Sequence, residues 1–153
     1  MKILFICTHN RCRSILSEAI TNQLTDSHVV ARSAGSQPVD EVHPLSIKYL
    51  EQSGFDTLGL TSKSWHQLES FAPDVVVTVC DSAASESCPV WFGQAIKVHW
   101  GLEDPSKIDD AKEAERAFLH TIEIISERAK QINQIALLPK EQWQQAFSNL
   151  GVN

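Results

Sequence analysis

The sequence predicts an α/β protein built on a doubly wound, four-stranded parallel sheet with helices on both faces. Short runs of branched apolar residues alternate with longer amphipathic segments, and short loops connect them. No repeat, linker or low-complexity stretch interrupts the 153 residues. Hydrophobic residues make up 42% of the chain, which is enough for one core, so we expect a single domain over residues 1–153.

Four segments have the composition of buried strands. They span residues 2–6, 28–33, 74–80 and 96–100, and each is a short run rich in bulky or branched side chains. The first leads directly to Cys7, and the third contains four valines and ends on Cys80. Ligands of doubly wound sheets bind at the carboxyl ends of the strands, where we expect Cys7, Cys80 and the loop after Trp100.

Five further segments predict helices. Residues 13–24 place apolar side chains at 15, 16, 19, 20 and 24 on one face. Residues 44–53 begin with a proline, which suits a first helical turn, and end before Gly54. A short helix is expected over 64–71. A long amphipathic helix is expected over about 109–138, with apolar residues at 114, 118, 122, 125, 129, 132 and 135. Pro139 interrupts it, and Trp143, Phe147 and Leu150 predict a final short helix.

The overall charge and composition exclude several classes of protein. The formal net charge of −6 argues against a nucleic-acid-binding surface, although one local basic pocket is compatible with it. No stretch approaches the ~18 apolar residues of a membrane span, and the amino terminus lacks the apolar core of a signal peptide, so we expect a cytoplasmic protein. The histidines are scattered without ligand spacing, and we predict neither a metal nor another cofactor.

The four cysteines are Cys7, Cys12, Cys80 and Cys88. In a reducing compartment they are not expected to form a permanent disulfide framework. Their expected roles are catalytic, metal-binding or inert.

The eight residues between the first strand and the first helix carry the strongest functional signal: Cys7-Thr8-His9-Asn10-Arg11-Cys12-Arg13-Ser14. A polar loop at this position turns backbone N–H groups inward, where they and the positive helix end can hold a tetrahedral oxyanion. The same positive field favours Cys7 as a thiolate nucleophile. Arg13 can direct a planar, charged fork at two oxygens of the anion, and Ser14 is placed to donate its hydroxyl to the Cys7 sulfur.

A less specific interpretation is that Cys7 is an ordinary buried cysteine and that the basic residues are solvated loop charges. However, a cysteine followed after five residues by arginine and serine, all between a buried strand and a helix, is a compound pattern. We therefore favour an oxyanion-binding site that contains an activated nucleophile.

This pattern resembles the low-molecular-weight tyrosine phosphatases and the arsenate reductases that share their fold, and it looks most like the arsenate reductases. The resemblance implies the strand order 2-1-3-4 and extends over nearly the whole chain. Two residues depart from the family pattern. His9 stands where the family commonly has glycine, and Arg11 stands where it has a small residue.

The resemblance also assigns an acid to the loop after the fourth strand, where the chain reads Gly101-Leu102-Glu103-Asp104-Pro105. Asp104 would protonate the leaving oxygen of a phosphate ester or the departing hydroxyl of arsenate. The alternative is that Asp104-Pro105 is only a turn dipeptide. A phosphatase of this family usually has aromatic residues next, to stack on phosphotyrosine, but this chain continues Ser106-Lys107-Ile108.

By analogy with the arsenate reductases, the downstream cysteines supply the two electrons that arsenate reduction requires. Cys7 would form a thiol–arsenate adduct, Cys80 would attack Cys7 as arsenite leaves, and Cys88 would then attack Cys80. Seven residues separate Cys80 from Cys88, where the best-known thioredoxin-linked relatives have six. The alternative is that one of these cysteines is buried packing and the other a chance surface thiol. Cys12 would be structural, or a bystander able to form an off-pathway disulfide with Cys7.

We call residues 7–14 the anion loop. Asn10, Glu18 and Ser33 match family positions that brace this loop. Some members bind a potassium ion there, and Lys63 stands at the position that resembles a carboxylate of that cation site. Its ammonium could replace the ion, or Lys63 could be a solvated loop charge. Trp91 and Phe92 could form a docking patch for a redox protein, but core packing is the preferred interpretation.

Three functions remain open at this point. Arsenate reductase is preferred, with arsenate as substrate, phosphate or sulfate as analogues, and thioredoxin as reductant or a glutathione and glutaredoxin system as the alternative. A low-molecular-weight protein tyrosine phosphatase is second, and a non-catalytic oxyanion-binding or redox-sensing module is third. We expect a monomer with no nucleic-acid or membrane partner.

Overall fold

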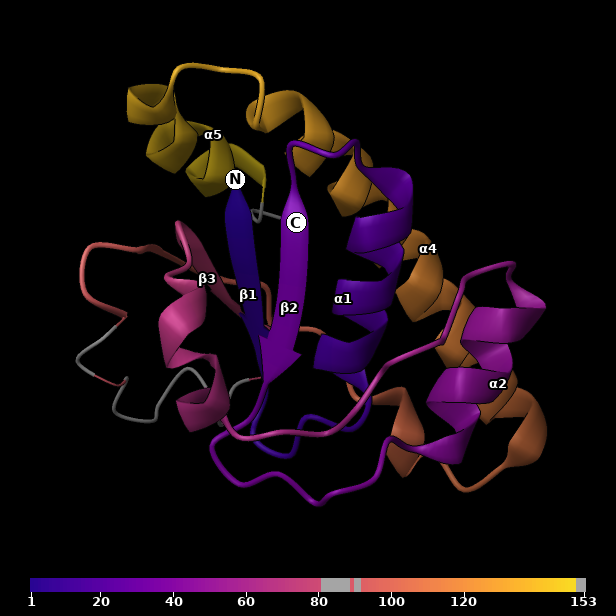
Figure 1. Cartoon of the computed structure of the whole chain (residues 1–153). Helices are drawn as coiled ribbons and strands as arrows, with labels where there is room; N and C mark the ends of the chain where they lie inside the picture. The colour runs from indigo at the N-terminus through magenta and orange to yellow at the C-terminus, as the bar shows by residue number, and fades with distance from the viewer. Residues whose placement is uncertain (81–88, 90–91, 151–153) are drawn as a thin grey trace.

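A four-stranded parallel sheet in the order β2-β1-β3-β4 forms the centre of the protein (Figure 1). The strands are β1 (Lys2–Ile6), β2 (Val30–Ala34), β3 (Val75–Thr78) and β4 (Ile96–His99). All three strand pairs are parallel, so both the predicted sheet and its order are confirmed. The computed structural model describes residues 1–80, 89 and 92–150.

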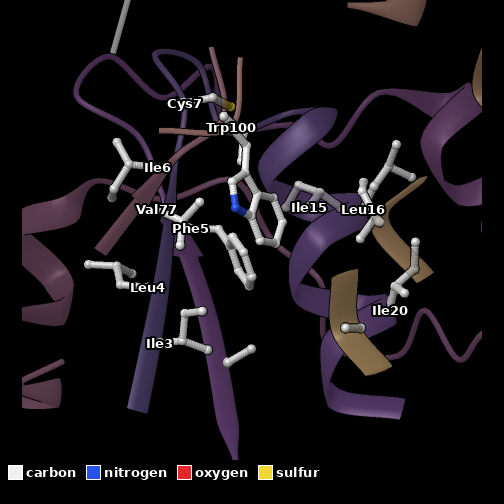
Figure 2. Packing of buried hydrophobic residues seen from close by; sticks show 14 of the residues in the cluster. Ile3, Leu4, Phe5, Ile6, Cys7, Ile15, Leu16, Ile20, Val77 and Trp100 are labelled. Carbon is white, nitrogen blue, oxygen red and sulfur yellow. The ribbon is translucent and has the colours of Figure 1, made fainter. Parts of the chain in front are cut away.

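The central strand β1 is buried because helices cover the sheet. Ile3, Leu4 and Phe5 have no exposed surface and Ile6 has 1%, and burying side chains of this size stabilises a fold by ~1.5–3 kcal/mol each. The Phe5 ring contacts the indole of Trp100 at a centroid distance of 5.4 Å (Figure 2). The core therefore continues from the middle of the sheet to the loop after β4.

The helices are α1 (Arg13–Leu24), α2 (Pro44–Gln52), α4 (Ala111–Ile135) and α5 (Trp143–Leu150), with 3₁₀ turns η1 (Trp65–Phe71), η3 (Pro105–Lys107) and η4 (Lys140–Gln142). α1 and the long α4 lie on one side of the sheet and η1 lies on the other (Figure 1). All seven apolar positions used to predict α4 are buried. Within the described residues, none of the helices is both long and apolar enough to cross a bilayer.

Several predicted boundaries were wrong by a few residues. β2 begins at Val30 rather than at position 28, because the Val29 N–H donates to the Asp26 carbonyl in a turn. α4 ends at Ile135 rather than at 138, because Leu137 and Leu138 are 71% and 40% exposed and do not continue its buried face. The short helix predicted over 64–71 is present as η1, a kinked 3₁₀ helix that begins one residue later, at Trp65.

Backbone hydrogen bonds continue past the carboxyl ends of the strands. The Val79 N–H donates to Ile6 O at 2.9 Å, and the Leu102 N–H donates to Val79 O at 3.1 Å. These bonds hold the segments that follow β1, β3 and β4 against one another. As a result, the Cys7 loop, Cys80 and the loop around Asp104 lie at the same edge of the sheet, as doubly wound folds require of a ligand site.

Candidate active site

The loop between β1 and α1 surrounds a buried thiol. Cys7 is 4% exposed, directly after the last residue of β1, and α1 begins at Arg13. Asn10 is fully buried and has a positive φ of 49°, a conformation that asparagine adopts more readily than most residues. The tight loop therefore depends on an asparagine at this position.

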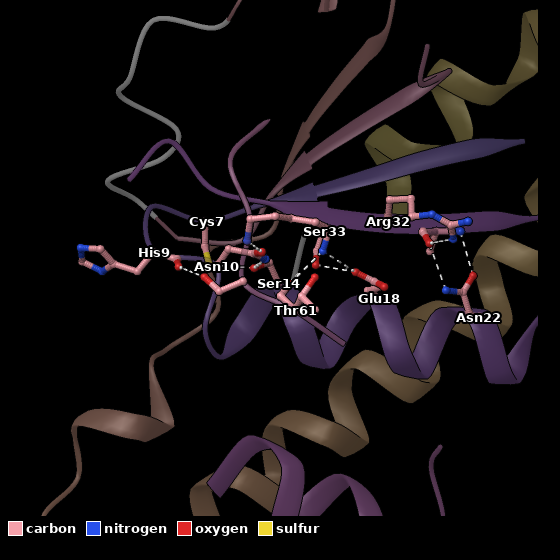
Figure 3. Close-up of polar contacts among 12 residues, drawn as sticks. Cys7, His9, Asn10, Ser14, Glu18, Asn22, Arg32, Ser33 and Thr61 are labelled. Carbon is pink, nitrogen blue, oxygen red and sulfur yellow. Dashed lines mark hydrogen bonds and ion pairs between the residues drawn. The ribbon is translucent and has the colours of Figure 1, made fainter. Parts of the chain in front are cut away.

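A directed chain of hydrogen bonds reaches the Cys7 sulfur (Figure 3). The Lys63 backbone N–H donates to Asn10 Oδ1 at 2.9 Å, which orients the Asn10 amide so that its Nδ2 donates to Ser14 Oγ at 2.8 Å. Ser14 Oγ lies 2.9 Å from Cys7 Sγ. Because Ser14 Oγ already accepts from Asn10, its proton is available for the sulfur, and a thiolate is the better acceptor.

On its outer side, the loop is held by two of its carbonyl oxygens, which accept hydrogen bonds from residues outside it. Ser62 Oγ donates to His9 O at 2.9 Å, and the His43 N–H donates to Arg11 O at 2.9 Å. The His9 side chain is exposed and points away from the Asn10 and Ser14 network (Figure 3). The His9 side chain therefore takes no part in the hydrogen bonds inside the loop.

Gly35 is a supporting residue that the sequence had marked only as part of a turn. A Cβ atom at Gly35 would lie 2.5 Å from Thr8 O, 2.8 Å from Cys7 O and 3.0 Å from Asn10 N. The absence of a side chain at Gly35 thus allows the anion loop to pack directly on the end of β2. No local sequence pattern reveals this contact, because the loop lies more than twenty residues earlier in the chain.

Arg13 connects the anion loop to residues 101–105, which we call the acid loop. Its Nη1 donates to Leu102 O at 2.8 Å, and its Nη2 lies 3.4 Å from Asp104 Oδ2. The other oxygen of Asp104 accepts from the Ser106 N–H at 3.0 Å and from Ser106 Oγ at 2.6 Å, which caps η3. Asp104 is thus both a turn residue and a partner of Arg13.

A cleft of about 280 Å³ opens over Cys7. The loop residues Cys7, Thr8, His9, Arg11, Cys12 and Arg13 line it together with Cys80, Asp104, Ser106 and Lys107. Cys80 is 4% exposed, and its sulfur lies 3.8 Å from Thr8 Oγ1. Three thiols, two guanidiniums and a carboxylate therefore share one cleft. Ser106 and Lys107 were not expected there.

The model of the low molecular weight phosphotyrosine protein phosphatase family matches residues 2–143 of this chain. The chain belongs to this family. Within it, a "Glutaredoxin arsenate reductase" of Synechocystis sp. is 33% identical over 104 residues, which are 68% of this chain and 78% of the relative.

Two solved structures that are similar to this family member are also described as arsenate reductases. "An arsenate reductase in the phosphate binding state" has a TM-score of 0.73 at 28% identity. The match covers 87% of this chain and 96% of that one. A thioredoxin-dependent arsenate reductase of Corynebacterium glutamicum has a TM-score of 0.68 at 28% identity, with 88% of this chain matching 61% of that one. The arsenate reductase branch of the family is thus the one this chain resembles.

Cys12 is a second buried thiol in the loop of this family member. It is 3% exposed, and burial raises the pKa of its thiol to about 12. The nearby Asp104 carboxylate acts in the same direction, while Ser46 opposes the change. Cys12 therefore remains a neutral thiol at physiological pH.

Glu18, Ser33 and Lys63 form a polar cluster behind the anion loop of this family member. Ser33 Oγ donates to Glu18 Oε1 at 2.5 Å, and the Lys63 ammonium lies 3.6 Å from the same oxygen. Lys63 Nζ also donates to Thr61 O at 2.9 Å. Burial lowers the pKa of Lys63, and Glu18 counteracts part of this change.

Two predicted features lie outside the described residues, namely Cys88 and Trp91. Phe92 is 2% exposed, and its ring meets Trp65 edge-on at 5.7 Å, so Phe92 is a core residue.

Among the residues described, no three His, Cys, Asp or Glu side chains gather as they do around a metal ion. A larger cavity, of about 710 Å³, lies between the loop after β4 and α4, away from Cys7 and Cys80.

Proposed function

We propose that this protein is an arsenate reductase that converts arsenate to arsenite. The observation that carries the proposal is the presence of Cys7 and Cys80 in the same cleft. A phosphatase needs one thiolate, whereas reduction of arsenate takes two electrons, which two thiols supply by forming one disulfide. The arsenate reductase names of the relatives support the same chemistry.

In the first step, the Cys7 thiolate attacks the arsenic of an arsenate held by the loop N–H groups and Arg13. Ser14 donates to the sulfur before attack, and the Arg13 guanidinium offsets the charge of the oxyanion. A hydroxyl leaves arsenic as water after it receives a proton from Asp104. The product is a thiol–arsenate adduct in which arsenic is still pentavalent.

In the second step, the Cys80 thiolate attacks the Cys7 sulfur. The sulfur–arsenic bond breaks, arsenic keeps the electron pair, and trivalent arsenite leaves. Cys88 then attacks Cys80, which releases the Cys7 thiolate and leaves a Cys80–Cys88 disulfide for thioredoxin to reduce. A glutathione and glutaredoxin system is the alternative donor, in line with the name of the Synechocystis relative.

We further propose that the Lys63 ammonium is the resident counter-charge of Glu18. It lies 3.6 Å from the carboxylate that holds Ser33, and the Lys63 backbone orients Asn10. One residue thus braces the loop through both its ammonium and its amide. In this arrangement the enzyme needs no added monovalent cation.

All these residues belong to one chain, which fits a monomer. Thiol donors of the cytoplasm would reset the relay.

Phosphotyrosine hydrolysis is the second candidate, because the family is that of the phosphotyrosine phosphatases. Ser106 and Lys107 follow Asp104-Pro105 in place of an aromatic platform. We therefore expect aryl phosphate hydrolysis to be slow.

The test is arsenate-dependent NADPH oxidation with thioredoxin and thioredoxin reductase, with an aryl phosphate assay in parallel. The parent should turn over, and Cys80→Ser and Cys88→Ser should stop after at most one arsenite per enzyme. Cys12→Ser is the matched control and should keep turning over. Arsenate turnover that survives Cys88→Ser would contradict the relay, and aryl phosphate hydrolysis without arsenate reduction would make the protein a phosphatase.

A further inference from the structure

Two cations in the cleft have no anionic partner. Among the described residues, neither the Arg11 guanidinium nor the Lys107 ammonium forms a hydrogen bond or an ion pair, and Arg11 Nε is buried without a hydrogen-bond partner. A buried donor without a partner is costly, because it has lost its hydration. In a protein of net charge −6, two unpaired cations at one cleft indicate an anionic ligand.

The oxyanion does not account for both charges. Arg13 and the loop N–H groups already provide the cradle. Arg11 projects from that loop, whereas Lys107 comes from η3, on the acid-loop side. Among the described residues, the side chains lining the cleft include the cations of Arg11, Arg13 and Lys107 and one carboxylate, that of Asp104, which is paired with Arg13.

The cleft is also larger than one tetrahedral anion requires. A five-atom oxyanion at about 15 Å³ of cavity per water-sized atom would fill about 75 Å³, which is roughly a quarter of the 280 Å³ cleft. The remaining volume suits a short aliphatic group with a second small anionic group. Among the described residues that line the cleft there is no phenylalanine, tyrosine or tryptophan, and Ser106 and Lys107 stand on the side of Asp104.

We propose that Arg11 and Lys107 form a carboxylate-binding subsite, and that the protein also hydrolyses short phosphate monoesters that carry a carboxylate. The phosphate would occupy the Arg13 cradle, and the carboxylate would meet the two unpaired cations. This activity rests on Cys7 and Asp104 acting as they do in the proposed function.

The reaction is hydrolysis and needs no electron donor. The Cys7 thiolate attacks phosphorus, a phosphorus–sulfur bond forms, and the ester phosphorus–oxygen bond breaks. Protonated Asp104 gives its proton to the leaving alkoxide. Water then attacks phosphorus, Asp104 takes the water proton, the phosphorus–sulfur bond breaks, and inorganic phosphate leaves with Cys7 again a thiolate.

The experiment compares kcat/KM for 2-phosphoglycolate with that for 2-hydroxyethyl phosphate, in which a neutral hydroxymethyl group replaces the carboxylate. We expect a preference of at least about tenfold for phosphoglycolate, equivalent to about 1.4 kcal/mol. Because both esters carry the same phosphate group, any effect of a variant on phosphate binding or transfer cancels in the ratio of the two kcat/KM values. Arg11→Gln and Lys107→Gln should each reduce the ratio, and Arg11→Lys should restore part of it.

Arg116→Gln and Lys112→Gln are matched controls, because both residues are exposed on α4 and outside the cleft. Both should retain the full ratio. Lys107 is also exposed, so its variant should fold even if an Arg11 variant does not. Equal kcat/KM for the two esters, absence of hydrolysis of phosphoglycolate, or faster hydrolysis of an acidic phosphopeptide than of phosphoglycolate would each overturn the proposal.

Arsenate-dependent NADPH oxidation, run on the same preparations, separates the two proposals. Arsenate turnover without a carboxylate preference would overturn the subsite and leave the reductase intact. A carboxylate preference without arsenate turnover would support the subsite and contradict the reductase.

Discussion

Replacing Gly35 with alanine tests how closely the anion loop depends on its packing against β2. The added Cβ would lie 2.5 Å from Thr8 O, and ordinary contact begins at 3.4 Å. The loop backbone must therefore move by about 0.9 Å to relieve the repulsion. The other two close atoms, Cys7 O and Asn10 N, also belong to the loop backbone, so no side chain can rotate to absorb the change.

Two effects of different size follow from this displacement. Overpacking of a well-packed site costs ~1–3 kcal/mol, which in a protein of this length lowers Tm by about 2–12 °C. Misplacing reacting groups by about 1 Å costs about 100-fold in rate. We therefore expect Gly35→Ala to remain folded but to lose about 100-fold in kcat/KM for arsenate.

The assay pairs calorimetric melting with the coupled arsenate assay. Gly59→Ala is the control, because Gly59 has a φ of +82° but nothing within 4 Å of an added Cβ. It should lose stability through backbone strain and retain activity. The reasoning is refuted if Gly35→Ala retains more than about half of the parent kcat/KM.

Three further predictions concern titration and helix capping. His43 Nδ1 accepts from the Leu45 N–H at the start of α2, and burial, aided by Arg11, lowers the pKa of His43 below 6.5. The unfolded chain then takes up this proton first, so the free energy of unfolding should fall as pH decreases through about 6.5 and level off above it. Urea midpoints on either side of that pH should show this, and His43→Asn should weaken it. Because burial raises the pKa of Cys12 to about 12, Cys12→Ala should leave the pH profile of turnover unchanged; a shifted profile would show that the Cys12 thiol ionises in the working range. Asp110 accepts from the Glu113 N–H as the cap of α4, so Asp110→Ala should cost ~0.5–2 kcal/mol in chemical denaturation, while Asp110→Asn should cost less.

The sheet and the long helix could be predicted because their burial leaves a direct mark on the sequence. The apolar run of β1 and the seven buried positions of α4 follow the periods of a strand and a helix. Errors arose where apolar residues continue beyond an element. Leu137 and Leu138 extend the pattern of α4 but are exposed past its end.

The proximity of the loop residues could be predicted for the same local reason, since eight consecutive residues contain Cys7, Arg13 and Ser14. Gly35, Ser106 and Lys107 could not be predicted. Gly35 matters through backbone atoms of a distant loop, and Ser106 through a hydrogen bond to Asp104. Lys107 reaches the cleft only because η3 turns there. Such contacts depend on the tertiary fold, and no short-range pattern specifies them.

The Arg13 guanidinium bonds Leu102 O and Asp104. In the function that we propose, the same guanidinium holds the oxyanion, so oxyanion affinity and the position of the acid loop would be thermodynamically linked. Linkage is reciprocal, so the factor by which anion affinity differs between two positions of the loop is also the factor by which anion binding shifts the equilibrium between those positions. Substitutions near Leu102, which do not reach the anion, should therefore appear in measurements as changes in oxyanion affinity.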